Sequence, residues 1–231
     1  FKEFKQDEKI KDLLRQSKAM GCFYVESPAM RMLLSKLCCD DYLTLVAASS
    51  IIRPGVASSG MMREYIVRFH KVRNGDTYDS IHPKMNELMR DTYGVMVYQE
   101  DVIKVAHHFA GITLTEADVL RRGMSGKYRS REEFQRVRDR FFEECYKKGY
   151  AQHVIDRVWL EIESFSGYSF AKGHSASYAV ESYQSLFLKA HYPLEFMVGV
   201  INNFGGFYRT EFYFHEARMN GAKIEAPCVN H

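Results

Sequence analysis

Cysteine is scarce in this chain of 231 residues, and its spacing fits neither a disulfide framework nor a zinc site. The cysteines are odd in number, without any CxxC motif: Cys22, Cys38, Cys39, Cys145 and Cys228. The adjacent pair Cys38–Cys39 suits neither an ordinary disulfide nor tetrahedral zinc spacing. The histidines form no HExxH motif. We therefore expect no bound metal, and reduced thiols of the kind found in the cytoplasm.

Long apolar runs are also missing. No stretch approaches 18 consecutive apolar residues, so the sequence predicts no transmembrane helix and no membrane partner. The chain opens FKEFKQDEKI, which is charged from Lys2 onward and lacks the pattern of a signal peptide. Because it opens with Phe1 rather than Met, we expect a fragment of a longer protein.

Charge is nearly balanced overall but uneven along the chain. With 46% hydrophobic and 26% charged residues and a net charge of +3, the composition is that of an ordinary globular protein. Between residues 121 and 148, however, ten Lys and Arg residues stand against five Asp and Glu. Such a block is either a solvated face or a phosphate-binding surface, and charge alone does not separate the two.

Helical spacing dominates the pattern, and alternating strand patterns are nearly absent. Helix starts are expected at Ser27 before Pro28, at Asp40 or Asp41, and at Ser130 in a capping box with Glu133. Further helices are expected over residues 60–73, 151–165, 175–191, 193–203 and 210–220. The sequence predicts a mainly α fold with at most short β segments.

Some local expectations are more specific. A first helix around Ile10 is expected to end at Gly21, and residues 22–26 (CFYVE) are strand-like. Thr115 and Asp118 are expected to begin the helix that carries Arg121. Only five prolines occur, and no linker divides the composition, so one domain over residues 1–231 is expected.

Adjacent acidic residues do not form a metal site by themselves. The pairs are 40–41, 132–133 and 143–144, and neighbours on a helix point about 100° apart. Two-metal enzymes need carboxylates that converge on one point. No P-loop, nucleophile elbow or GxGxxG motif occurs either. We therefore expect no catalytic residues and no metal ligands in this chain.

Two adjacent arginines are the strongest anion-binding candidates. Guanidinium groups such as those of Arg121 and Arg122 match phosphate oxygens in bidentate geometry. Lys127, Arg129 and Arg131 follow them in a segment that contains Gly126. A solvated basic face is the alternative interpretation.

A second candidate is the stretch FSGYSFAKGHSASY at residues 165–178. It can present Lys172 and His174 to an anion at a helix N-terminus, and Tyr168 or Phe170 could stack on a base. The alternative is that the aromatic residues are core and His174 only caps the helix. The turn at Arg53, in the tract RPG, is a weak signal when taken alone.

Together these tracts resemble the fingers domain of the bacterial DNA polymerase III α subunit, a family C DNA polymerase. The resembling tracts follow the family's order over nearly the whole chain: CFYVESPAMRMLL, LVAASSIIRPG, TYGVMVYQEDVIKVA, GITLTEADVLRRGM, FSGYSFAKGHSASYAVESYQSLFLKAHYPLEFM and GAKIEAPCVN. The resemblance implies a helical fingers core over residues 27–220, a junction with the palm at 1–26 and an extended exit segment at 221–231.

The resemblance also implies site roles. Arg121 and Arg122 match paired arginines that contact the triphosphate of the incoming deoxynucleotide, and Arg53 lies near the same nucleotide. Lys172, His174 and Ser175 match a K-x-H-S motif beside the sugar and phosphates. His174, Tyr168 and Tyr178 are implied near the sugar and base, and Lys127, Arg129 and Arg131 near DNA phosphates.

The remaining implications concern the whole polymerase. Catalytic aspartates that hold Mg²⁺ belong to the palm, outside this chain, so the fragment alone is expected to be inactive. Expected partners are primer-template DNA, deoxynucleoside triphosphates, the palm and thumb, and replisome subunits such as the sliding clamp, all in the cytoplasm. Two alternatives stay open: a stand-alone nucleic-acid-binding module, and the fingers of an error-prone α-type polymerase.

The sequence departs from the family pattern beside the K-x-H-S motif. Many members read GYGFNKSHSAAYA where this chain reads GYSFAKGHSASYA, with Ser169, Ala171, Gly173 and Ser177 substituted. The charged contacts are kept, so these changes bear on the base pocket rather than on phosphate binding.

Overall fold

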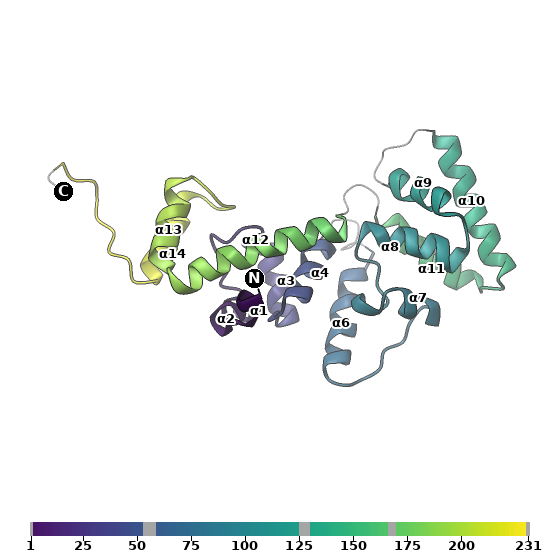
Figure 1. Ribbon diagram of the computed structural model, residues 1–231, viewed down its shortest axis with the longest axis horizontal. Helices are drawn as coiled ribbons and strands as arrows, with labels where there is room; N and C mark the ends of the chain where they lie inside the picture. The colour runs from purple at the N-terminus through teal and green to yellow at the C-terminus, as the bar shows by residue number, and fades with distance from the viewer. Residues whose placement is uncertain (1, 53–58, 125–129, 166–169, 230–231) are drawn as a thin grey trace. The chain divides into compact units, whose positions relative to one another are not determined.

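The computed structural model describes residues 2–52, 59–124, 130–165 and 170–229. Every regular element in these ranges is a helix (Figure 1), which confirms the mainly α fold. The chain divides into two compact units: unit 1 comprises Phe1–Ser49 with Ala176–His231, and unit 2 comprises Ser50–Ser175. The expected single domain and its subdivisions stay predictions. None of the helices in the described ranges is long and apolar enough to cross a membrane.

Unit 1 is built from the two ends of the chain. Its elements are α1 (Lys2–Gln6), α2 (Glu8–Arg15), α3 (Pro28–Leu37), α4 (Tyr42–Ile51, up to Ser49), α12 (Lys172–His191, from Ala176), α13 (Pro193–Asn202) and α14 (Thr210–Met219). Ile10 and Leu14 of α2 are fully buried, as are Leu33 and Leu34 of α3, so one apolar face of each helix forms core. Helices α13 and α14 pack together around the buried ring of Tyr213.

Local capping patterns in unit 1 were predicted correctly. The Ser27 side chain accepts a hydrogen bond from the Met30 amide, with Pro28 as the first residue of α3. Of the two acids before α4, Asp41 is the cap, because its carboxylate accepts from the Thr44 amide at 2.9 Å. Each cap satisfies a backbone donor that the helix leaves unpaired.

Two expectations for unit 1 were wrong. Helix α2 ends at Arg15, well before Gly21, because Ser17 takes a left-handed conformation (φ 54°) and the Lys18 amide bonds back to the Leu13 carbonyl. Residues 22–26 form turns rather than a strand, because Tyr24 also has a positive φ of 63° and breaks the extended conformation.

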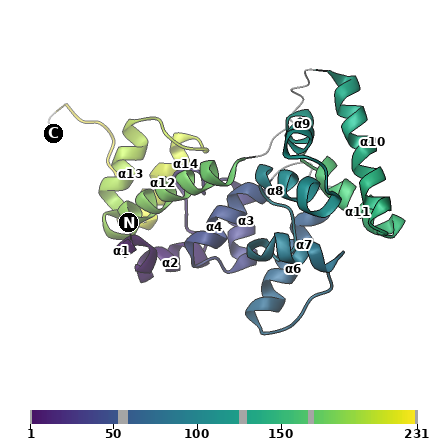
Figure 2. The same cartoon turned by 45° about the vertical axis from the view of Figure 1, so that its right-hand side comes forward.

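Unit 2 contains the helices of the middle of the chain. They are α6 (Met61–Arg73), α7 (Pro83–Leu88), the 3₁₀ helix η1 (Arg90–Thr92), α8 (Gln99–Lys104), the π-helix η2 (Val105–Ala110), α9 (Leu114–Met124), α10 (Arg131–Lys147) and α11 (Gln152–Glu163). Helix α9 packs against both α8 and α10 (Figure 2). Phe109, Leu120 and Phe141 are fully buried and contribute core side chains from η2, α9 and α10. The unit thus fixes α9 between two neighbours.

A glycine permits the close approach of α9 and α10. A Cβ atom added at Gly123 would lie 2.2 Å from the Phe134 ring, so no larger residue fits there without moving that ring. The predicted N-cap of α10 is confirmed, since the Ser130 hydroxyl accepts from the Glu133 amide at 3.2 Å. Gly123 directly follows the arginine pair, so this packing holds α9 in place where the arginines project.

The predicted start of α9 was wrong by a few residues. The helix begins at Leu114, and Thr113 caps it: its hydroxyl accepts from the Glu116 amide at 3.3 Å, while the Glu116 carboxylate accepts from the Thr113 amide at 2.9 Å. This reciprocal pair is a capping box. The start of α9 is therefore capped without Asp118.

Candidate functional site

Both candidate arginines lie near the end of α9 and share one carboxylate. Asp118, one turn earlier, accepts from the Arg121 Nε at 2.9 Å and lies 2.8 Å from its Nη2. Its other oxygen forms an ion pair with the Arg122 Nε at 3.0 Å. The three side chains are between 28% and 38% exposed, so they form a compact charged cluster that solvent and ligands can still reach.

The start of α8 connects this cluster to the start of α12. The Gln99 side chain accepts from the Arg121 Nη1 at 3.3 Å, and the Gln99 amide donates to the Phe170 carbonyl at 3.2 Å. The next residue, Glu100, accepts from the Lys172 amide at 3.0 and 3.1 Å. Glu100 thereby satisfies an unpaired donor at the first turn of α12. Arg121 and Lys172, far apart in sequence, are thus both attached to the dipeptide Gln99–Glu100.

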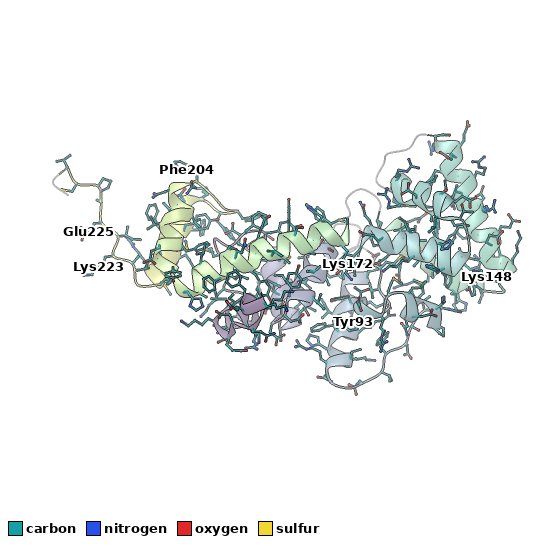
Figure 3. The ribbon with its side chains drawn as sticks, viewed as in Figure 1. Tyr93, Lys148, Lys172, Phe204, Lys223 and Glu225 are labelled. Atoms are coloured by element: carbon teal, nitrogen blue, oxygen red, sulfur yellow. The ribbon has the colours of Figure 1, made fainter. Side chains whose placement is uncertain are left out.

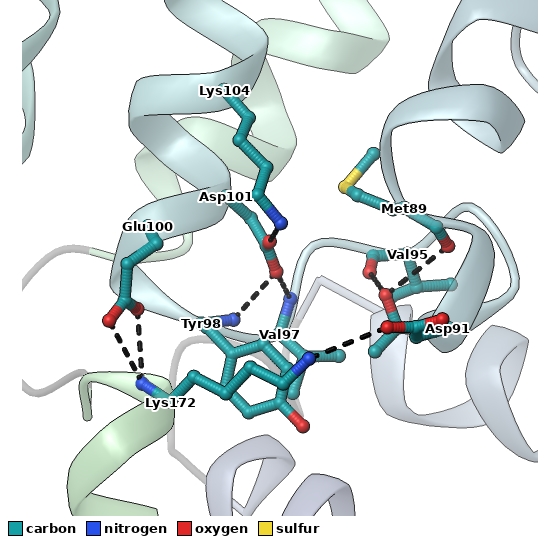
Figure 4. Close-up of polar contacts among 10 residues, drawn as sticks. Met89, Asp91, Val95, Val97, Tyr98, Glu100, Asp101, Lys104 and Lys172 are labelled. Atoms are coloured by element: carbon teal, nitrogen blue, oxygen red, sulfur yellow. Dashed lines mark hydrogen bonds and ion pairs between the residues drawn. The ribbon is translucent and has the colours of Figure 1, made fainter.

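Lys172 is the first residue of α12 (Figure 3), and its side chain extends past the Tyr98 ring toward Asp91 (Figure 4). Its Nζ lies 5.4 Å from the centre of the Tyr98 ring and 3.4 Å from an Asp91 carboxylate oxygen, as Figure 4 shows. Asp91 is 81% exposed, so this ion pair contributes little stability. The ammonium group is therefore held loosely enough to change partner.

A cavity of about 200 Å³ adjoins Lys172. Tyr98, Arg90 and Lys104 line it, together with Asp101. Burial raises the pKa of the Asp101 carboxyl, while the amides of Tyr98 and Val97, at 2.8 and 2.9 Å, favour its charged form (Figure 4). Asp101 thereby fixes the turn into α8, because a buried carboxylate that accepts from backbone amides restrains the chain around it.

The other residues of the K-x-H-S motif have different surroundings. His174 is exposed, and its ring lies 4.8 Å from that of Phe170. Ser175 is buried (2% exposed), and its hydroxyl lies 2.5 Å from the hydroxyl of Ser50. Tyr178 belongs to unit 1, where its ring meets that of Tyr24 edge-on at 4.9 Å. The structure therefore brings Lys172 and His174 to an accessible position and encloses Ser175.

Several candidate residues lie outside the described part of the chain: Arg53, Lys127, Arg129 and Tyr168. The predicted roles of these residues stay predictions. Of the basic residues expected at DNA phosphates, Arg131 is described. It is the exposed first residue of α10, and the positive end of the helix dipole adds to its charge.

The sequence patterns did not point to Asp118, Gln99 or Glu100 as part of the site. Asp118 had a signal, because acids three and four positions before arginines lie on the same helix face. Gln99 and Glu100 had none beyond their place in the tract YQED, since their partners come from distant segments. Asp91 likewise meets Lys172 only through the fold.

Within the described ranges, no three His, Cys, Asp or Glu side chains come together as a metal-binding group. The acids nearest the site have other partners: Asp118 holds two guanidinium groups and Glu100 a backbone amide. A divalent cation needs several oxygen ligands around one point, and these side chains do not provide it. The described residues therefore do not fit a magnesium site.

Comparison with known proteins gives the family. The model for the bacterial DNA polymerase III alpha subunit finger domain matches residues 2–149. The chain is 38% identical over 228 residues to the DNA polymerase III subunit alpha of Escherichia coli K12 and 34% identical over 224 residues to that of Aquifex aeolicus. The same subunit of Staphylococcus aureus is 33% identical over 225 residues.

Each alignment covers 97% of this chain but only 19% to 20% of the relative. The match thus extends over both units, while most of each relative has no counterpart in this sequence. The family match and the resembling tracts agree on the same part of that subunit. The chain belongs to the family of bacterial DNA polymerase III alpha subunit finger domains.

Proposed function

We propose that this chain forms the fingers of a DNA-directed DNA polymerase and binds the triphosphate of the incoming deoxynucleotide through Arg121, Arg122 and Lys172. The observation that carries the proposal is the shared attachment of Arg121 and Lys172 to Gln99–Glu100. Two cationic segments that are joined through the same dipeptide can act on one polyanion together. A solvated face would not need such a connection.

The chemistry of these three side chains suits a triphosphate. Guanidinium groups donate paired hydrogen bonds to phosphate oxygens, and the lysine supplies a compact point charge. In phosphoryl and nucleotidyl transfer, such groups offset negative charge that develops on the leaving phosphates. Mg²⁺ and its carboxylate ligands belong to the palm in this proposal, so the fingers contribute binding and orientation.

His174 is the proposed contact to the sugar. It is exposed, and its ring lies against Phe170 at the start of a helix, which limits its rotation. A bulky ring at this place can exclude a ribose 2′-hydroxyl by its size. His174→Ala should then raise kcat/KM for ribonucleotides relative to deoxynucleotides, whereas an unchanged ratio would assign the sugar contact to Tyr178 instead.

Primer-template DNA is the proposed second ligand. Arg131, at the start of α10, would meet a phosphate together with Lys127 and Arg129. Ser175 is enclosed against Ser50, and its assigned role is to fix the first turn of α12. The same proposal gives the chain three further partners: the palm, the thumb and a sliding clamp. It also places the chain in the cytoplasm.

The experiment measures steady-state kinetics of the intact polymerase with each of the four deoxynucleotides. Arg121→Ala or Arg122→Ala should raise KM about tenfold or more for all four, because losing a charge-assisted contact costs about 1.5–3 kcal/mol and a phosphate contact carries no base information. Arg136→Ala, an exposed arginine of α10, is the matched control and should leave KM unchanged. A defect confined to one base would overturn the triphosphate assignment.

A further inference from the structure

Asp118 contacts both candidate arginines within unit 2. It lies three positions before Arg121 and four before Arg122, so all three side chains lie on one face of α9. Each of its oxygens has its own partner, since Oδ1 contacts Arg121 and Oδ2 contacts Arg122. One negative charge thus holds two positive groups that would otherwise repel each other.

We propose that Asp118 is a positioning residue that holds the guanidinium groups of Arg121 and Arg122 in place to bind a triphosphate. The inference rests on the proposed function of the two arginines and concerns a residue that touches no substrate. In Arg122 the ion pair is made at Nε, 3.0 Å from Asp118 Oδ2, where the geometry is not that of a hydrogen bond. In Arg121 the pair with Asp118 uses Nε and Nη2, while Nη1 donates a hydrogen bond to Gln99.

The energetic reason is preorganisation. An arginine side chain has many rotamers, so fixing each of the two side chains on binding would otherwise cost entropy. A carboxylate that already pairs with both guanidinium groups removes part of this cost before the nucleotide arrives. It also offsets the repulsion of two adjacent guanidinium groups.

A competing interpretation has the opposite consequence. If Asp118 occupied the arginines in place of a triphosphate, removing its charge would strengthen nucleotide binding. The two interpretations therefore predict changes of opposite sign.

The test uses the intact polymerase with Asp118→Asn. Asparagine keeps the size but has one oxygen, and its amide donors would face an arginine donor. We expect KM for all four deoxynucleotides to rise about three- to tenfold with kcat changed less than about twofold, and the inhibition constant of inorganic tripolyphosphate to rise by the same factor. Asp118 is 38% exposed, so the variant should fold with an unchanged melting temperature.

Two further variants complete the experiment. Asp139→Asn removes the same charge from an exposed site on α10, where the aspartate bonds to Gln135, and should change neither constant. Asp118→Glu keeps the charge and should be less impaired than Asp118→Asn. If the glutamate variant is the more impaired of the two, charge on this side chain does not position the arginines and the inference is wrong.

The outcomes separate this inference from the proposed function. If Arg121→Ala and Arg122→Ala raise KM but Asp118→Asn does not, the positioning role is overturned while triphosphate binding stands. A lower KM and tighter tripolyphosphate binding in Asp118→Asn would show that Asp118 competes with the triphosphate for the arginines. This result would overturn the positioning role as well. If the arginine variants themselves leave KM unchanged, the proposed function fails.

Discussion

Two carboxylates, one in each unit, serve different purposes. In unit 1, Glu26 is 6% exposed and accepts from neutral donors: the Gly21 amide at 2.7 Å, the Tyr213 hydroxyl at 2.9 and 3.0 Å, and the Phe207 amide. In unit 2, Asp118 is 38% exposed and pairs with two cations. The surroundings thus decide what an acid does: a buried carboxylate with neutral donors fixes the chain, and a half-exposed one with cations holds charged side chains together.

Replacing the buried carboxylate of Glu26 should give the largest change in stability. Glu26→Ala leaves two amides and the Tyr213 hydroxyl without this acceptor, and an unsatisfied buried donor costs about 1–3 kcal/mol. We expect the free energy of unfolding to fall by about 4 kcal/mol, measured by urea denaturation, while KM for nucleotides stays unchanged. Glu195→Ala, an exposed acid of α13, is the control. A nucleotide-specific defect in Glu26→Ala would contradict the separation of the two roles.

A third carboxylate, that of Glu161, is buried and makes the stability of the fold depend on pH. Glu161 of α11 is 1% exposed, and burial, with the nearby charge of Glu64, raises its pKa to about 7. Because the folded chain holds this proton more tightly than the unfolded chain, the contribution of Glu161 to stability is fully present below pH 4.5 and is lost as pH rises to about 7. The total loss is about 3 kcal/mol.

Glu161→Gln removes this titration. Its melting temperature at pH 8 should exceed that of the unsubstituted chain, and the difference should shrink toward pH 5. Glu163→Gln, two residues further along α11, is the matched control because its carboxylate accepts from the Trp159 indole. If Glu161→Gln gives the same pH profile as the unsubstituted chain, Glu161 is ionised in the folded state at neutral pH and this explanation of the residue is wrong.

Replacing an exposed acid should change the free energy of unfolding least. Asp91 lies 3.4 Å from the Lys172 ammonium and is 81% exposed, so Asp91→Asn should change the free energy of unfolding by less than about 0.5 kcal/mol. Thermal unfolding at low and high salt measures this. A loss above about 1 kcal/mol would show that exposure does not separate the two kinds of carboxylate.

Local patterns made much of the fold predictable. The caps at Ser27 and Ser130 depend on residues within a few positions of one another, and the structure has both. The mainly α fold was predicted from the helical spacing of the apolar residues. The strand predicted over residues 22–26 was wrong because Tyr24 has a positive φ. This conformation is rare for a tyrosine and cannot be inferred from the pattern of apolar residues.

The site was predictable only in part. Its cations stood out because arginine pairs and lysines near a helix start have a recognisable chemistry. Their partners did not, since Glu100 and Lys172 are separated by 72 positions and meet only in the folded unit. Asp118 was assigned to the helix start because acids favour that place, yet Thr113 and Glu116 already satisfy the donors there.

The most direct test is a structure of the intact polymerase with primer-template DNA and an incoming deoxynucleotide. We predict Nη groups of Arg121 and Arg122 at about 3 Å from phosphate oxygens of the nucleotide, while the Asp118 carboxylate still contacts both Nε atoms. Arginines directed at the template strand, or a nucleotide bound with the Asp118 contacts broken, would contradict this prediction.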